Sequence, residues 1–123
     1  MAYFTHEKAA ILISKELGEA VDRGRPMLIS AVNAGEVFYG LGRRLSEKEA
    51  ETGLGVLAGL GVETRAADEN QARSAAGFKL RWGLGYADSF AAALTLSSLG
   101  VLLTGDPDFH RVEKEIKIHW VIT

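Results

Sequence analysis

The sequence contains no cysteine, only two prolines and no long apolar run. Without cysteine there are no disulfides, zinc–thiolate sites or cysteine nucleophiles, which fits a reducing cytoplasm. A membrane-spanning helix needs about 20 consecutive apolar residues, and the run at 91–96 is far shorter. Glu7 and Lys8 interrupt the start of the chain, where a secretion signal would be apolar. We therefore expect a soluble, cytoplasmic protein that does not associate with membranes.

The chain also has little net charge, because 14 Lys and Arg residues are balanced by 16 Asp and Glu residues. Nonspecific nucleic-acid binding depends on the neutralisation of phosphates by Lys and Arg. A histone-like or polybasic binder is therefore not expected, whereas an enzyme with metal-binding carboxylates is compatible with this charge. The length of 123 residues, with 47% hydrophobic and 24% charged residues, is typical of one globular domain, which we expect to span residues 1–123.

Hydrophobic spacing and capping signals predict helices that alternate with strands. The expected helices are one over 6–21, one capped by Ser30 or Asn33, one opened by Ser46 with Glu49, one opened by Asp68 with Gln71, and one that begins near Asp88 and stops at Gly100. The expected strands cover 27–30, 62–64, 101–104 and a half-exposed segment at 116–122. This alternation indicates an α/β fold with a mostly parallel sheet flanked by helices.

In parallel α/β sheets, ligands gather at the carboxyl ends of the strands. Glu36 follows the first of these expected strands closely, and Asp106 follows the strand at 101–104 directly. Each acid also has a simple structural explanation. Asp106 and Asp108 stand in a turn-like sequence, Asp88 is a first-turn helix acid, and Glu36 can be solvated. Taken together, these acids could hold Mg²⁺ or Mn²⁺, which prefer oxygen ligands, but their spacing alone does not show that they converge.

Three ordered segments give a more specific signal: ISAVNAGEV at 29–37, LGYADSFAAA at 84–93 and LTGDPDF at 103–109. With these motifs the chain resembles the PIN domains of VapC-type toxins over nearly its whole length. The resemblance implies a three-layer PIN-like domain. It also implies a metal-dependent endoribonuclease that hydrolyses RNA phosphodiesters, dimerises and binds an antitoxin. Glu36, Asp88 and Asp106 would then be catalytic acids that hold Mg²⁺ or Mn²⁺, with Asp108 as an auxiliary metal ligand.

The resemblance further implies that Asn33 and Thr104 are supporting polar groups. One feature departs from the family, whose domains usually open with a central strand that ends in an Asp. Residues 1–7 resemble the stretch that follows this Asp, so we expect a domain that is N-terminally incomplete, with an incomplete acidic site. A misplaced start, trimming and true loss of the strand all fit the sequence. Two hypotheses follow: a ribonuclease, inactive or weakly active as the chain stands, or a noncatalytic module that binds an antitoxin or self-associates.

Other residues carry weaker signals. The histidines share no ligand spacing, so we expect surface or core roles for His6, His110 and His119. Several basic residues could contact RNA phosphates or simply lie on solvent-exposed helix faces. They are Arg43, Arg44, Arg73, Lys79 and Arg81. The Gly-Leu-Gly segments at 53–55 and 83–85 lack the strand, length and lysine of a phosphate-binding loop. The apolar residues that exceed the needs of a small core, and that predict a homodimer, are Phe4, Phe38, Tyr39 and Leu41.

Overall fold

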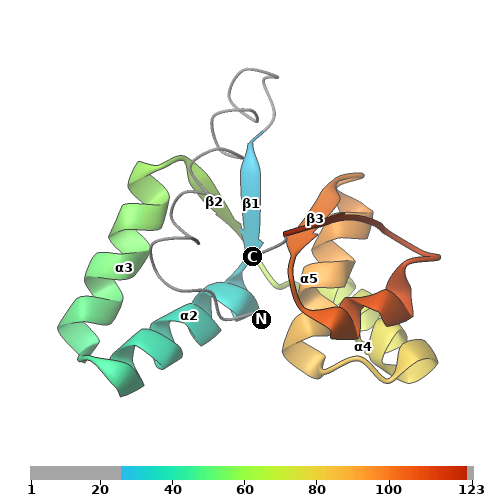
Figure 1. The fold of residues 1–123 in the computed structure, drawn as a ribbon, viewed down its shortest axis with the longest axis horizontal. Helices are drawn as coiled ribbons and strands as arrows, with labels where there is room; N and C mark the ends of the chain where they lie inside the picture. Colours follow the sequence, from blue (N-terminus) through green and yellow to red (C-terminus); the bar gives the residue numbers. More distant parts are fainter. Residues whose placement is uncertain (1–25, 122–123) are drawn as a thin grey trace.

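A computed structural model describes residues 26–121 of the chain. The elements in chain order are β1 (Met27–Ser30), α2 (Ala31–Arg44), α3 (Glu47–Gly59), β2 (Val62–Arg65), α4 (Glu69–Trp82), α5 (Tyr86–Ser97), β3 (Val101–Thr104), the 3₁₀ helix η1 (Pro107–Val112) and β4 (Lys117–Trp120). Figure 1 shows α2, α3 and β2 on one side of β1, and β3, α4 and α5 on the other. The helix expected over 6–21, together with Phe4 and His6, lies outside the described residues.

Side-chain caps begin three of the helices where the sequence predicts them. Each cap accepts a hydrogen bond from an N–H group that the first turn would otherwise leave unpaired. The bonds run from Val32 N to Ser30 Oγ (3.3 Å), from Glu49 N to Ser46 Oγ (3.0 Å) and from Gln71 N to Asp68 Oδ1 (2.9 Å). Helix α5 begins at Tyr86 after Gly85, slightly before the expected start near Asp88.

The strands pair in parallel, as predicted. Strand β1 pairs with β2 from Met27↔Val62 to Ser30↔Arg65, and β3 pairs with β4 from Val101↔Lys117 to Thr104↔Trp120. Within the described residues these are two separate two-stranded sheets. Helix α5 contacts both β1 and β3, and therefore links the two pairs. The α/β fold class with parallel strands and flanking helices is confirmed.

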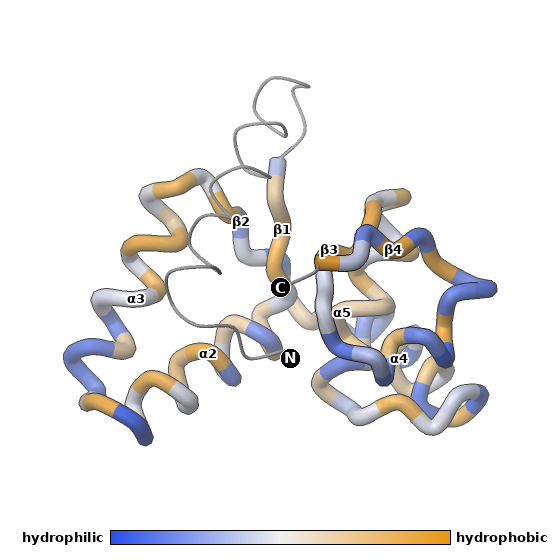
Figure 2. The backbone as a smooth tube through the Cα atoms, viewed as in Figure 1, coloured by the Kyte–Doolittle hydropathy of each residue, from blue (hydrophilic) through white to orange (hydrophobic). Residues whose placement is uncertain are grey.

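The main hydrophobic core lies among α4, α5, η1 and the β3–β4 pair. Its largest fully buried apolar side chains are Phe78, Leu84 and Val112. On β4, Ile118 and Trp120 are partly buried while Lys117 and His119 are exposed, which confirms the predicted alternation of the final strand. In Figure 2, hydrophilic residues dominate the corner between α2 and α3. None of the helices between residues 26 and 121 has the length and apolar character needed to cross a bilayer.

Candidate metal centre

The loop after β3 is held by two successive side-chain-to-backbone hydrogen bonds. Thr104 Oγ1 accepts from the Asp106 N–H at 3.1 Å, and Asp106 Oδ1 accepts from the Asp108 N–H at 2.9 Å. Asp106 therefore caps η1, as its structural explanation predicts, and uses one carboxylate oxygen to do so. Since the cap occupies only part of the acceptor capacity of a carboxylate, Asp106 can both cap the turn and bind an ion. Thr104 supports the loop backbone.

Asp88 approaches this loop from a different element. It lies in the first turn of α5, next to the buried Ser89, whose hydroxyl donates to the Gly85 carbonyl at 2.9 Å. One carboxylate oxygen from each of Asp88, Asp106 and Asp108 lies within 4.8 Å of the other two. Two cis ligands of an octahedral Mg²⁺ at ~2.1 Å stand about 3 Å apart, and trans ligands about 4.2 Å. The three carboxylates therefore fit a divalent cation with only small side-chain adjustments.

The electrostatics of the cluster differ from one acid to the next. Burial raises the pKa of Asp88 above its ordinary value of 3.8, and the negative charges of Asp106, Glu36 and Asp108 raise it further. The pKa of Asp106 is instead lowered, chiefly because its carboxylate accepts the hydrogen bond from the Asp108 backbone. A bound cation would offset the repulsion at Asp88, because opposite charge favours the ionised carboxylate.

Glu36 lies beside this cluster rather than within the group of three. It is exposed on α2, and the Asn33 amide group donates to Glu36 Oε1 at 3.4 Å and to the Ala87 carbonyl at 2.9 Å. Asn33 therefore ties the start of α2 to the start of α5, next to Asp88. The structure brings Asp88, Asp106 and Asp108 together, and it places Glu36 near enough for its charge to act on Asp88. The catalytic roles of these residues stay predictions.

The other polar candidates divide between ion pairs and exposed positions. Arg73 pairs with Glu69 at 2.9 Å, and Arg81 makes a bidentate pair with Glu115 at 2.8 and 2.9 Å. This pair lowers the pKa of Glu115. The remaining three cations are exposed, namely Arg43, Arg44 and Lys79. His119 is exposed on β4.

One aromatic contact near the cluster was not predicted. The His110 ring stacks on Trp120, with ring centroids 4.2 Å apart and planes at 25°. Residues 110 and 120 meet only because β4 returns to pair with β3 after η1. The one sequence feature that pointed toward this contact was the position of Trp120 at the end of an alternating strand.

The fold and the cluster define an α/β domain with acids that converge at the carboxyl ends of its strands. A sequence model of the PIN domain matches residues 1–115. The chain therefore belongs to the PIN domain family, as the three sequence motifs predict.

A solved structure gives the same result for the fold. The chain is similar to one in the structure described as "Crystal structure of DNA bound VapBC from Salmonella typhimurium", with a TM-score of 0.68 and 22% sequence identity. The match covers 87% of this chain and 82% of that one. At this identity the likeness concerns the fold alone. A search of curated proteins finds no match.

Proposed function

We propose that this chain is a metal-dependent endoribonuclease of the toxin–antitoxin type, acting as a single PIN domain on RNA phosphodiesters. The observation that carries the proposal is the approach of Asp88, Asp106 and Asp108 to within 4.8 Å of one another from two separate elements. Membership of the PIN family supports the nuclease class. The fold likeness to a chain of a VapBC structure supports the toxin type.

In the proposed site, Asp88, Asp106 and Asp108 hold Mg²⁺ or Mn²⁺. Such an ion would act as a Lewis acid on the phosphate and lower the pKa of bound water. Glu36 is exposed and oriented by Asn33, so its carboxylate is available to accept a proton from the attacking water. Thr104 and Asn33 act through the groups they hold: Thr104 positions the Asp106 loop, and Asn33 positions Glu36 against the start of α5.

The proposed partners are an antitoxin protein and a second copy of the chain. Tyr39 is 66% exposed on α2, and further large exposed apolar side chains near it in sequence are Leu45, Val56 and Leu60. Such residues favour a protein-binding surface. Phe38 and Leu41 are only partly buried. The Leu41 side chain approaches Gly53 closely, because its Cδ1 lies 2.5 Å from the position that a Cβ on Gly53 would take. Leu41 thus also packs α2 against α3. The absence of cysteine fits action in the cytoplasm.

The second candidate function is a noncatalytic interaction module that uses this apolar surface to bind an antitoxin or to self-associate. The exposed side chains on α2 and α3 favour it, because they do not depend on the acidic cluster. The two functions differ in one respect that can be measured. The ribonuclease cleaves RNA and loses this activity when an acid of the cluster is neutralised, whereas the interaction module binds its partner and cleaves no RNA.

The test is cleavage of a mixed pool of single-stranded RNA by the purified chain, with Mg²⁺ or Mn²⁺ and with a chelator. We expect weak metal-dependent cleavage by the native chain, and a further fall of more than about 100-fold in Asp88→Asn and Asp106→Asn, because loss of even an indirect metal contact costs about 10- to 100-fold. Glu51→Gln removes the same charge from an exposed position on α3 and should cleave as the native chain does. Circular dichroism checks that each variant is folded.

Two results would contradict the ribonuclease. Cleavage that persists in the presence of the chelator would show that the activity does not depend on a metal ion. A native chain that is folded, binds a partner protein and cleaves no RNA with either ion would favour the interaction module instead.

A further inference from the structure

The His110–Trp120 stack lies at the carboxyl end of the β3–β4 pair, the end that also carries Asp106. Trp120 pairs with Thr104 across the two strands, and Thr104 holds the backbone of Asp106. His110 follows Asp108 closely in the same 3₁₀ helix. The two rings therefore stand at the carboxyl end of the β3–β4 pair, on the edge of the sheet where the proposed metal centre lies. This placement puts an aromatic surface at the same end of the strands as the proposed metal centre.

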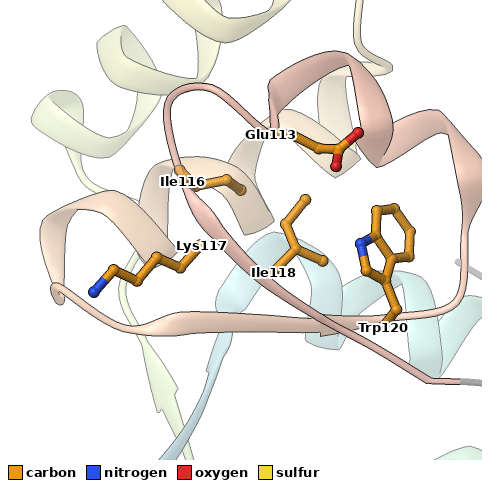
Figure 3. A pocket seen from close by; sticks show the side chains of 5 residues that line it. All are labelled: Glu113, Ile116, Lys117, Ile118 and Trp120. Atoms are coloured by element: carbon orange, nitrogen blue, oxygen red, sulfur yellow. The ribbon is translucent and has the colours of Figure 1, made fainter.

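Trp120 also lines a hollow with a volume of about 310 Å³. Ile116 and Ile118 supply more of its apolar wall, and Glu113 and Lys117 are its charged members. Figure 3 shows the Trp120 and Ile118 side chains next to each other, with the Glu113 carboxylate above them and Lys117 extending away from the indole. Small-molecule sites have volumes of about 300 to 1,000 Å³. The hollow is therefore at the small end of this range, which suits a single planar group better than a large ligand.

The stack is not explained by burial alone. The His110 side chain is 58% exposed, and its Nδ1 lies 2.6 Å from Glu113 Oε1, whose side chain is 49% exposed. A contact that only filled the core would exclude more water than this one does. His110 and Glu113 instead hold each other at the surface and keep the imidazole against the indole. The result is an aromatic surface whose orientation is set while the hollow beside it stays open.

We propose that this hollow binds one unpaired base of a single-stranded RNA, which lies against the indole of Trp120. The inference rests on the proposed ribonuclease function and gives that site a subsite for its substrate. Single-stranded nucleic acids are commonly bound by stacking bases on aromatic side chains, with little dependence on sequence. A double-stranded RNA cannot offer an unstacked base, so the chain should prefer single-stranded RNA.

The charges of the hollow decide which part of the nucleotide enters it. The Glu113 carboxylate repels a phosphate, and Trp120 with Ile118 offers an apolar face, so the base and not the backbone should lie against Trp120. Lys117, at the other end of the hollow, is exposed and can attract a neighbouring phosphate. From the Trp120 end of the hollow, the backbone would continue toward the acidic cluster, where a bound cation would compensate the negative charge of the carboxylates.

The experiment measures RNA binding with saturating Mg²⁺, in an Asp106→Asn chain that should not cleave. The probe is a short single-stranded oligouridylate, followed by fluorescence anisotropy. Adding Trp82→Phe leaves Trp120 as the one indole of the chain, so stacking of a base should quench its fluorescence. We expect quenching on binding, and a loss of affinity of about 5- to 100-fold in Trp120→Leu, which is the range for removal of one stacked base. Trp120→Phe should lose less, because it keeps an aromatic face.

Leu80→Ala is the control, since Leu80 is an exposed apolar residue on α4 that does not line the hollow. Three results would overturn the inference: binding without quenching, equal affinity of Trp120→Leu and Leu80→Ala, or no binding of the oligonucleotide at all. If Trp120→Leu does not fold, the quenching experiment on the intact indole and the Trp120→Phe variant still decide. Metal-dependent cleavage by the native chain is measured separately. The ribonuclease proposal therefore survives a failure of the stacking experiment, and the base-binding subsite survives a failure to detect cleavage.

Discussion

The β1–β2 region (residues 27–65) and the β3–β4 region (residues 69–121) are both built from parallel strands and helices, yet they are packed differently. In the β3–β4 region, nine hydrophobic residues form one buried cluster that includes Phe78, Leu84 and Phe109. In the β1–β2 region the buried hydrophobic residues are Ala34 and Ala50, which are both small. An apolar cavity of about 60 Å³ also lies among α2, α3 and the two strands of this region. Among residues 26–121, this difference places most of the packing free energy in the β3–β4 region.

This difference bears directly on the proposed site. Asp88, Asp106 and Asp108 all belong to the β3–β4 region, so a packed core fixes the elements that bring them together. Glu36 belongs to the other region and is connected to α5 by the hydrogen bonds of Asn33. A catalytic constellation depends on supports that hold it to within a fraction of an ångström. The three clustered aspartates have such supports, whereas the position of Glu36 depends on how firmly α2 is held against α5.

The largest expected effect comes from removing a core side chain. Leu84 is 1% exposed, so Leu84→Ala should lower the free energy of unfolding by about 2 to 5 kcal/mol. Leu57→Ala, in the β1–β2 region, should cost about 1 kcal/mol, because Leu57 is only partly buried and already borders the cavity. Urea denaturation followed by circular dichroism measures both. Equal losses in the two variants would show that the two regions are packed alike.

A smaller effect should appear in the acids of the cluster, in the absence of metal. Burial raises the pKa of Asp88 in the folded state, so its stabilising contribution is complete below its ordinary pKa of 3.8 and is lost as the pH rises through the raised value. Asp88→Asn removes this penalty and should be more stable than the native chain at pH 7. The gain should shrink as the pH falls below about 4.

Asp106 should behave in the opposite way. Its folded-state pKa is lowered by the hydrogen bond from the Asp108 backbone, so its contribution is present above 3.8 and is lost as the pH falls through the lowered value. Asp106→Asn should therefore be less stable than the native chain at pH 7. Thermal unfolding of the native chain and the two variants is measured from about pH 3 to about pH 8, a range that extends below and above the ordinary carboxyl pKa. It checks whether each substitution raises or lowers stability. A destabilised Asp88→Asn variant would mean that this carboxylate is not strained in the fold.

Much of this architecture could be predicted from the sequence because its determinants are local. The caps at Ser46 and Asp68, the compact strand at 101–104 and the acids that follow it all depend on neighbouring residues. The prediction of where α5 ends was less accurate. The helix was expected to stop at Gly100, but the left-handed residue is Leu99, with φ of 54°, and the Gly100 N–H closes the turn onto the Thr95 carbonyl.

The site could be predicted less completely, because its geometry depends on contacts between distant segments. Asp108 was expected as an auxiliary ligand, yet the hydrogen bond between its N–H and Asp106 brings it into the cluster of three, while Glu36 stands beside it. The pairing of Trp120 with Thr104 was also not predicted, since strand register is set by the packing of the whole sheet. For this reason the His110–Trp120 stack could not be inferred from the sequence.

The central claim is that the three clustered aspartates bind a divalent metal ion, and a Mn²⁺ titration tests it most directly. Free Mn²⁺ is followed by electron paramagnetic resonance at neutral pH as the native chain, Asp88→Asn, Asp106→Asn and Glu51→Gln are added. We predict that the native chain and Glu51→Gln bind Mn²⁺ alike, and that Asp88→Asn and Asp106→Asn bind it at least about 10-fold more weakly. Superimposable titrations of all four folded proteins would contradict the claim, because the cluster would then contribute nothing to metal binding.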